Sequence, residues 1–279
     1  MKKVIVILLT AALLLSCIGC KKAENKKLTV AMSPDFAPME FVDTSKSGQE
    51  QYVGFDVTLA NFLANELGME LEIKPMSFDA CMTAVQLGSA DMAISGFSWK
   101  PDRAENFLLS DYYIAGDNET QQSVVTVKAK ENTCKTQADF SGWKVGAQAS
   151  SLQEQLVKDE LIPAGAELVV YKSIDDAVLA LQTGKIDALA VAHGNGEAII
   201  ANNPDLAFTG FDFDVDPKYE NNLILLNKNS TEMLEKVNKV LAKAMAAGVY
   251  DGWYEDAKAL AGIPTAADVS YDDDGKPVS

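Results

Sequence analysis

The chain has 279 residues, of which 48% are hydrophobic and 23% are charged, the composition of an ordinary globular protein. Its 40 acidic residues outnumber its 24 Lys and Arg residues and give a net charge of -16. This charge argues against nucleic acid as a partner, because phosphate binding depends on clustered Lys and Arg. With a single histidine and no cysteines at metal-ligand spacing, we expect neither a metal site nor a cofactor.

Residues 1–16 have the features of a lipoprotein signal peptide. Two lysines precede an apolar run, 4–15, which is too short to span a bilayer and has the length of a signal-peptide core. The sequence LLLSCIGC resembles a bacterial lipobox, which predicts lipidation of Cys17, with Cys20 as the second candidate. The alternative is an ordinary secretory peptide with incidental cysteines. Residues 17–27 are the predicted tether, because KKAENKK at 21–27 is polar and rich in lysine. We therefore expect the protein on the extracytoplasmic face of the cell membrane, held by a lipid anchor.

After the tether, short apolar strands alternate with amphipathic helices. The predicted strands are LTVAM at 28–32, MELEIKPM at 69–76 and ADMAIS at 90–95, and the predicted helices are FDVTLANFLANELG at 55–68 and FDACMTAVQLG at 78–88. Each helix ends at a glycine, Gly68 or Gly88, the residue that most readily terminates a helix. This alternation predicts an α/β protein with mostly parallel sheets.

The chain contains an internal repeat. FDACMTAVQLGSADMAI at 78–94 aligns without gaps with IDDAVLALQTGKIDALA at 174–190, and each copy follows a predicted strand. WKVGAQ at 143–148, followed by a helix from Ser151, repeats the strand and helix that open the first half. Chance similarity between two helix-glycine-strand units is the alternative. The repeat predicts two similar Rossmann-like α/β lobes.

Two chain crossings are expected between these lobes. An extended stretch leaves the first lobe near Gln121, and a second one returns near residues 222–226, before two helices that we expect to pack on the first lobe. The predicted boundaries are 28–121 plus 226–263 for lobe 1, 122–225 for lobe 2 and 264–279 for a flexible acidic tail. Paired crossings make a hinge, and α/β sheets bind ligands in the crevice beyond the carboxyl ends of their strands.

Two cysteines lie outside the predicted signal peptide and tether. We interpret Cys81 and Cys134 as buried thiols, although a disulfide between them is compatible with an extracytoplasmic compartment.

Five segments together resemble the substrate-binding proteins of amino-acid ABC transporters, solute-binding protein family 3. These segments are FAPMEF at 36–41, GFDVTLANFLANELG at 54–68, GSADMAISGFSWKPDRAENFLLSDYY at 88–113, GWKVGAQASSLQE at 142–154 and GKIDALAV at 184–191. The resemblance covers nearly the whole mature chain and implies the type 2 periplasmic-binding-protein fold. It also implies a two-crossing hinge and a ligand cleft between the lobes.

The resemblance assigns the ligand carboxylate to Arg103, whose planar guanidinium matches a carboxylate in two hydrogen bonds. The residues Ser95, Gly96, Phe97 and Ser98 end a strand, where Gly96 lets backbone groups face the cleft. Without the family, a surface arginine paired with Asp102 or Glu105 would be the simpler interpretation of Arg103.

The second lobe and three aromatic residues complete the implied site. Ser151 and Gln153 would add donors for the carboxylate, although simple helix capping is the alternative. The family sandwiches the ligand side chain at the positions of Phe36, Phe78 and Phe97, whereas Phe55 and Phe62 have the helical spacing of core residues.

Two positions depart from the family pattern. The family usually has an aspartate for the ligand ammonium where this chain has Ala192, and a second carboxylate of some relatives is here Ser33. A buried ammonium without a carboxylate partner is costly, so another group must compensate. The candidates for this compensation are Asp35, Glu40, Asn195 and Glu197.

The repeat aligns His193 with Phe97 and places it at the rim of the cleft. His193 would contact the ligand or the opposite lobe there, or it would be a solvent-exposed loop residue that caps the helix at 194–203. The sequence contains no Gly-x-Ser-x-Gly motif and no recognisable Ser/His/Asp constellation that would indicate a catalytic role for His193.

We therefore expect a monomeric binding protein with no catalytic residues. It captures a small ligand, an amino acid or related carboxylate, in the cleft and delivers it to an ABC permease. The alternatives are an enzyme on the same fold, such as a cyclohexadienyl or arogenate-type dehydratase, and a sensory surface lipoprotein.

Overall fold

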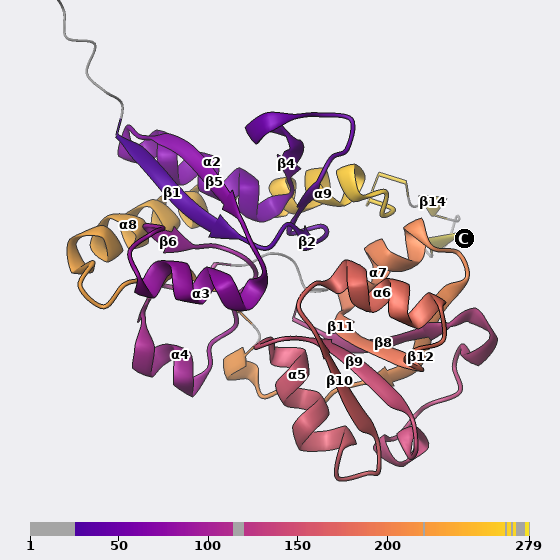
Figure 1. Ribbon diagram of the computed structural model, residues 1–279. Helices are drawn as coiled ribbons and strands as arrows, with labels where there is room; N and C mark the ends of the chain where they lie inside the picture. Colours follow the sequence, from indigo (N-terminus) through magenta and orange to yellow (C-terminus); the bar gives the residue numbers. More distant parts are fainter. Residues whose placement is uncertain are drawn as a thin grey trace, which may run out of the picture.

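The structure is a computed structural model that describes residues 26–113, 120–219, 221–265, 267–268, 270–271 and 277–278. The described chain forms two α/β lobes, each built around a five-stranded sheet (Figure 1). The predicted signal peptide and both lipidation candidates, Cys17 and Cys20, lie outside the described residues. Among the residues that are described, no helix combines the length and the apolar character needed to cross a bilayer.

The sheet of the first lobe has the strand order β5-β1-β6-β13-β7. The strands are β5 (Glu70–Pro75), β1 (Lys27–Met32), β6 (Met92–Ala93), β13 (Leu225–Leu226) and β7 (Leu108–Leu109). Strand β1 runs parallel to both neighbours, with Val30 opposite Ile73 on one side and Met92 on the other. Most of its residues are apolar and buried, as expected for a parallel strand covered on both faces.

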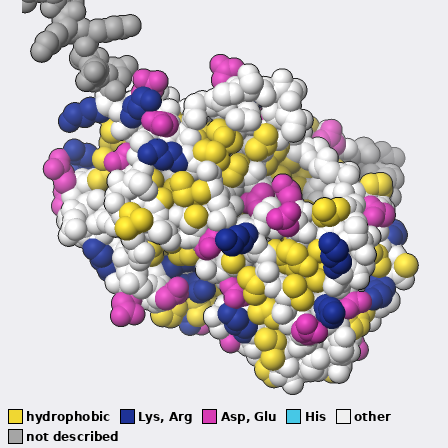
Figure 2. Space-filling view, in the orientation of Figure 1, with side chains coloured by type: hydrophobic (Ala, Val, Ile, Leu, Met, Phe, Trp, Pro, Cys, Tyr) yellow, Lys and Arg dark blue, Asp and Glu magenta, His cyan; other side chains and the backbone are white. Residues whose placement is uncertain are grey.

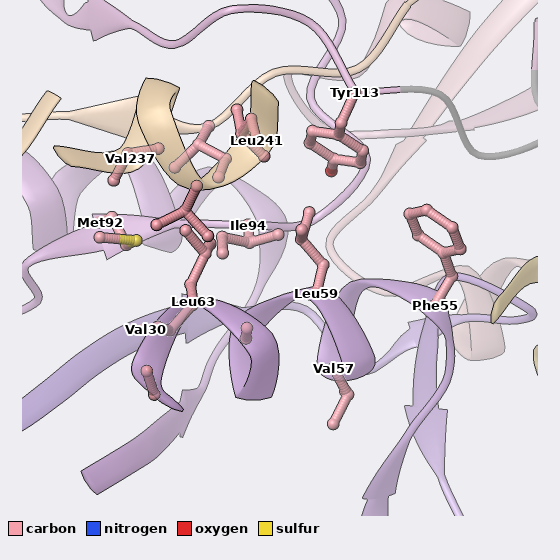
Figure 3. Packing of buried hydrophobic residues seen from close by; sticks show 14 of the residues in the cluster. Val30, Phe55, Val57, Leu59, Leu63, Met92, Ile94, Tyr113, Val237 and Leu241 are labelled. Atoms are coloured by element: carbon pink, nitrogen blue, oxygen red, sulfur yellow. The ribbon is translucent and has the colours of Figure 1, made fainter. Parts of the chain in front are cut away.

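Helices cover this sheet on both sides. They are α2 (Phe55–Leu67), α3 (Phe78–Gln86), α4 (Pro101–Asn106), α8 (Thr231–Ala247) and α9 (Tyr250–Ala261). Figure 3 shows Leu59 and Leu63 of α2 directed toward Ile94, with Val237 and Leu241 of α8 in the same cluster. Helix α2 ends at Gly68, which adopts the left-handed conformation, as predicted. The two C-terminal helices therefore belong to the first lobe.

The second lobe repeats this arrangement with the strand order β10-β9-β11-β8-β12. Its strands are β10 (Glu167–Tyr171), β9 (Lys144–Gln148), β11 (Ala188–Ala192), β8 (Gln122–Val127) and β12 (Leu206–Asp212). Its helices are α5 (Leu152–Leu156), continued by a π-helical turn over Val157–Leu161, then α6 (Ile174–Gln182) and α7 (His193–Asn202). The two copies of the sequence repeat occupy equivalent places, since α3 joins β5 to β6 and α6 joins β10 to β11.

The chain passes between the lobes twice. It leaves the first lobe after Tyr113 and enters the second at β8, and it returns before β13. The return lies a few residues earlier than the predicted boundary, because Leu223 and Ile224 are already buried in the cores of the first lobe. A small sheet of β2 (Asp35–Phe36), β3 (Glu40–Val42) and β4 (Tyr52–Val53) projects from the first lobe toward the second (Figure 1).

Both described cysteines are buried free thiols. Cys81 packs in a core cluster of the first lobe and Cys134 in one of the second, so the alternative of a disulfide between them is wrong. Near the end of the predicted tail, β14 (Ser270–Tyr271) pairs antiparallel with β15 (Pro277–Val278).

Candidate functional site

A cavity lies between the two lobes and encloses about 480 Å³ of space, part of it open to solvent. It is lined by every predicted site residue except Phe97 and His193, namely Phe36, Phe78, Ser95, Gly96, Ser98, Arg103, Ser151, Gln153 and Ala192. The residues that sequence analysis did not assign to the site are Gln148, Leu152, Ile174, Ala190 and Val191. Ser33, Glu40 and Asn195, considered only in connection with the missing aspartate, also line it.

Arg103 is the only basic side chain among the described residues that line this cavity. It is 1% exposed, and its guanidinium donates to the carbonyl oxygens of Ser98 at 2.5 Å and Ser150 at 2.9 Å. Its Nε–H has no partner, and the described chain provides no ion pair for it, so the simpler pairings with Asp102 and Glu105 are absent.

Burial lowers the pKa of Arg103 to about 10, which still leaves the group protonated at neutral pH. A buried cation without an anionic partner is costly to a folded protein. The arrangement thus provides a site for an anionic group of a ligand.

Two phenylalanine rings hold the guanidinium in place. The Phe78 and Phe97 rings stack with their centroids 4.4 Å apart, and Arg103 Cζ lies 5.5 Å and 5.1 Å from these centroids. Phe78 also lines the cavity, whereas Phe97 is fully buried in a core of the first lobe. The structure differs from the prediction here, because the chain bends at Gly96, which has a φ of +57°, and the Phe97 ring packs into the core while Ser98 lines the cavity. Phe97 therefore supports Arg103 from behind.

Gly96 and Phe36 fit together at the end of the first lobe's central strands. Gly96 has a φ of +57°, and a Cβ atom there would lie 2.7 Å from the ring of Phe36. Phe36 packs against core clusters of both lobes. Gly96 is thus required both for its backbone conformation and for the position of this ring.

The second lobe contributes the turn between β9 and α5. The Ser151 hydroxyl donates to the carbonyl oxygen of Gln148 at 2.7 Å and accepts from the amide of Glu154 at 3.0 Å. Ser151 therefore caps α5, the alternative considered from the sequence, while also lining the cavity. The Gln153 amide donates to the side chain of Gln122 at 2.6 Å, which orients it at the cavity wall.

Ala192 lines the cavity at the end of β11, but His193 does not line it. The His193 ring stacks on Phe208 with the centroids 4.4 Å apart, and its Nδ1 lies 2.8 Å from the hydroxyl of Ser123, which also donates to Asp212. His193 is the first residue of α7 and not a residue of an exposed loop. Sequence analysis missed both partners, because they lie on β8 and β12, far from His193 in the sequence.

Two buried polar residues of the cavity wall have unpaired atoms. Glu40 Oε2 and Asn195 Oδ1 have no hydrogen-bond partner among the described residues. The Ser95 hydroxyl donates to Glu40 Oε1, and Asn195 Nδ2 donates to the carbonyl oxygen of Ala37 at 2.9 Å. Of the four residues that the sequence offered in place of the missing aspartate, Glu40 and Asn195 reach the cavity and Asp35 and Glu197 do not line it.

The lobes are joined directly across the cleft. Asp35 of the first lobe accepts from the amide of Ile174 at 2.8 Å, and Arg103 and Asn195 make the other contacts named above. A wider groove of about 1200 Å³, including open solvent, adjoins the cavity and shares Ile174 and Asn195 with it. Acidic side chains gather where the lobes meet on this face (Figure 2).

Comparisons with known proteins agree with this geometry. The family of bacterial extracellular solute-binding proteins, family 3, matches residues 28–256. The arginine-binding extracellular protein ArtP of Bacillus subtilis is 29% identical over 248 residues, which are 86% of this chain and 92% of the relative. A probable histidine-binding protein of Campylobacter jejuni is 28% identical over 271 residues, covering 90% of this chain and 96% of the relative.

A solved structure extends the comparison to three dimensions. An amino acid ABC transporter substrate-binding protein from Streptococcus pneumoniae, bound to L-arginine, has a TM-score of 0.77 and 35% identity and covers 86% of this chain and 97% of its own. These findings confirm the predicted type 2 periplasmic-binding-protein fold and the prediction of solute binding rather than catalysis. The chain belongs to the bacterial extracellular solute-binding proteins of family 3.

Proposed function

We propose that this protein captures an amino acid or a closely related carboxylate between its lobes and delivers it to the permease of an ABC transporter. The observation that carries the proposal is Arg103, a buried cation that faces the cavity without an anionic partner. A ligand carboxylate satisfies the Nε–H of Arg103 and offsets its charge. A charge-assisted, two-point contact of this kind is among the strongest hydrogen-bonding arrangements in proteins.

The remaining lining residues divide the cavity into polar and apolar parts. Ser98 and the turn that contains Ser151 and Gln153 provide polar groups near the carboxylate, while Phe36 and Phe78 form an apolar wall for the ligand side chain. Because the carboxylate contacts come from both lobes, binding favours the form in which the lobes are together. A ligand shifts this equilibrium only by the difference between its affinities for the two forms.

The ligand's cationic group is assigned to Glu40 and Asn195. Ala192 offers no charge at the end of β11, whereas Glu40 is the one carboxyl group among the described residues lining the cavity. The named relatives bind arginine and histidine, and the similar solved structure holds L-arginine. We therefore place basic amino acids first among the candidate ligands.

A ligand screen tests this proposal. The purified protein would be heated with each common amino acid, with related amines and with small carboxylates, and every ligand that stabilises it would be titrated by calorimetry. A free ligand at about 100 times its dissociation constant stabilises the fold by about 2.7 kcal/mol, an easily measured change in melting temperature. If no amino acid or carboxylate stabilises the protein, the proposal is wrong. Chemical analysis of the recovered ligand separates binding from turnover.

We further propose that the mature protein is a monomer anchored by a lipid on Cys17, or on Cys20 as the second candidate. The support is the lipobox-like sequence before Cys17 and the polar tether after it. Metabolic labelling with a lipid analogue tests the anchor, and the variants C17A and C20A show which cysteine carries it. Absence of labelling in the wild-type protein would argue for an ordinary secreted protein, and labelling that survives in the double variant would overturn the assignment to Cys17 or Cys20.

A further inference from the structure

Two buried carboxyl groups lie next to each other at the wall of the cavity. Glu40 and Asp56 are both 0% exposed. The Ser95 hydroxyl donates to Glu40 Oε1, and Asp56 Oδ2 accepts from the amide of Gly96 at 2.8 Å and from the hydroxyl of Tyr113 at 3.0 Å. The other oxygen of each group, Glu40 Oε2 and Asp56 Oδ1, has no donor among the described residues.

The backbone brings these groups together. The amide of Asp56 donates to the carbonyl oxygen of Met39 at 2.8 Å, so Asp56 lies beside the residue that follows Met39. The two carboxyl groups are within hydrogen-bonding reach of each other. Two carboxylates at this separation repel each other, whereas one shared proton turns the repulsion into a hydrogen bond. That single proton also accounts for both unpaired oxygens.

The surroundings favour the protonated form. Burial, followed by the neighbouring Asp56, raises the pKa of Glu40 well above its usual range, and burial raises the pKa of Asp56 to about 7. The other titratable groups that face the pair are Tyr113, Asp35 and Cys81, and none of them supplies a positive charge.

We propose that Glu40 and Asp56 share one proton, and that a cationic group of the ligand displaces this proton into solvent when it binds beside Glu40. Glu40 contacts the ligand in this scheme, and Asp56 is a positioning residue that acts through Glu40. The inference rests on the proposed function, because it requires an amino-acid-like ligand whose carboxylate is on Arg103. The cavity then selects ligands that carry a cation at the distance of Glu40 from Arg103.

The shared proton makes binding depend on pH. If one proton leaves for each ligand bound, affinity rises by about tenfold per pH unit below the pKa of the pair and becomes constant above it. Two substitutions imitate the pair before and after Glu40 loses the shared proton. E40Q places an amide donor against Asp56 and mimics the singly protonated pair, with its negative charge fixed on Asp56 and not on Glu40. D56N donates to Glu40 and leaves a single carboxylate, while its amide oxygen still accepts from Gly96 and Tyr113.

Calorimetry with L-arginine and L-citrulline in buffers of different ionisation enthalpy measures the protons released. We expect the wild-type protein to release close to one proton per ligand below neutral pH, and both variants to release almost none. E40Q should bind more weakly than wild type, and D56N should bind as tightly as wild type or more so at acidic pH. Linkage with both ligands would place the α-ammonium beside Glu40, and linkage with L-arginine alone would place the guanidinium there.

A second measurement needs no ligand. Both carboxyl groups have a higher pKa in the folded protein than in the unfolded chain, so their stabilisation is present at low pH and is lost as pH rises through the pKa of the pair. The free energy of unfolding should therefore fall as pH rises from about 4, where the carboxyl groups of the unfolded chain ionise, to the pKa at which the folded pair loses its proton, and it should fall less in E40Q.

Each failure has a distinct meaning. Parallel stability curves for wild type and E40Q would overturn the shared proton. Binding without proton release would overturn its displacement by the ligand. If the wild-type protein binds neither probe, the proposed function fails for this ligand class and the displacement fails with it, while the stability curves still decide whether the proton is shared.

Discussion

Arg103 of the first lobe donates a hydrogen bond of 2.9 Å to the carbonyl oxygen of Ser150 in the second lobe. The residue that we assign to the ligand carboxylate therefore also holds the lobes together. If the ligand carboxylate binds Arg103 as proposed, ligand binding and closure are coupled through one guanidinium, because the ligand fixes the side chain in the position from which it reaches Ser150. Positioning by the Phe78 and Phe97 rings serves both contacts.

Substituting Arg103 should separate affinity from stability. R103A is expected to weaken ligand binding by about 2 kcal/mol or more, because the buried ligand carboxylate loses its partner. R103M removes a buried, unpaired charge but keeps an apolar side chain against the two rings, so the ligand-free protein should melt at the same temperature or higher. Calorimetry and thermal unfolding measure the two effects. Undiminished affinity in R103A would remove the central claim of the proposed function.

The two-lobe architecture could be predicted from the sequence because its signals are local. Apolar strands, glycines at helix ends and the repeated helix-glycine-strand unit each depend on residues close together in the chain. The two repeats indeed place α3 and α6 in equivalent positions. Gly96, in the bend after β6, and Ala192, at the end of β11, occupy equivalent positions of this pattern, and both line the cavity.

The positions of Glu40 and Asn195 at the cavity depend on tertiary structure. The sequence could therefore only include them among four candidates to replace the missing aspartate. Glu40 lies at the cavity because the residue before it, Met39, is hydrogen bonded through its carbonyl oxygen to the amide of Asp56. Asn195 belongs to the second lobe and contacts Ala37 of the first lobe where the lobes meet. The burial of Phe97 also depends on tertiary structure, because the chain bends at Gly96, so strand alternation does not give the direction of the Phe97 side chain.

Alanine at Gly96 should disturb both the fold and the cleft. The φ of +57° is strained for alanine, and the new methyl group would press against the ring of Phe36. Strain of this kind typically costs about 1–3 kcal/mol. G88A is a matched control, since Gly88 has a φ of +70° and no atom within 4 Å of an added Cβ.

The comparison of G96A with G88A isolates the contact with Phe36. Denaturant unfolding should show the larger loss of stability for G96A, and only G96A should weaken ligand binding. Equal losses in the two variants would mean that the Phe36 ring moves aside at no cost.

Asp35 is expected to stabilise the closed arrangement. Its carboxylate accepts from the amide of Ile174 at 2.8 Å across the cleft, and hydrogen bonds to charged groups contribute about 1.5–3 kcal/mol. D35A should therefore weaken ligand binding and shift small-angle scattering of the ligand-free protein toward a more open shape. D43A is the control. Asp35 and Asp43 both line the wider groove beside the cavity, but Asp43 pairs with Lys46 of its own lobe. Identical scattering and affinity in D35A and D43A would show that the Asp35 contact does not contribute to closure.

His193 should prove to be a structural residue of the second lobe. H193A removes the stacking on Phe208 and the hydrogen bond with Ser123, so the melting temperature should fall. The stacking alone contributes about 0.5–1.5 kcal/mol in typical aromatic pairs. H193F retains a ring against Phe208 and should recover most of this loss. Ligand affinity should be the same in wild type, H193A and H193F, because the imidazole packs on Phe208 and Ser123 and does not line the cavity. A variant with unchanged melting temperature and weaker binding would instead place His193 in contact with the ligand.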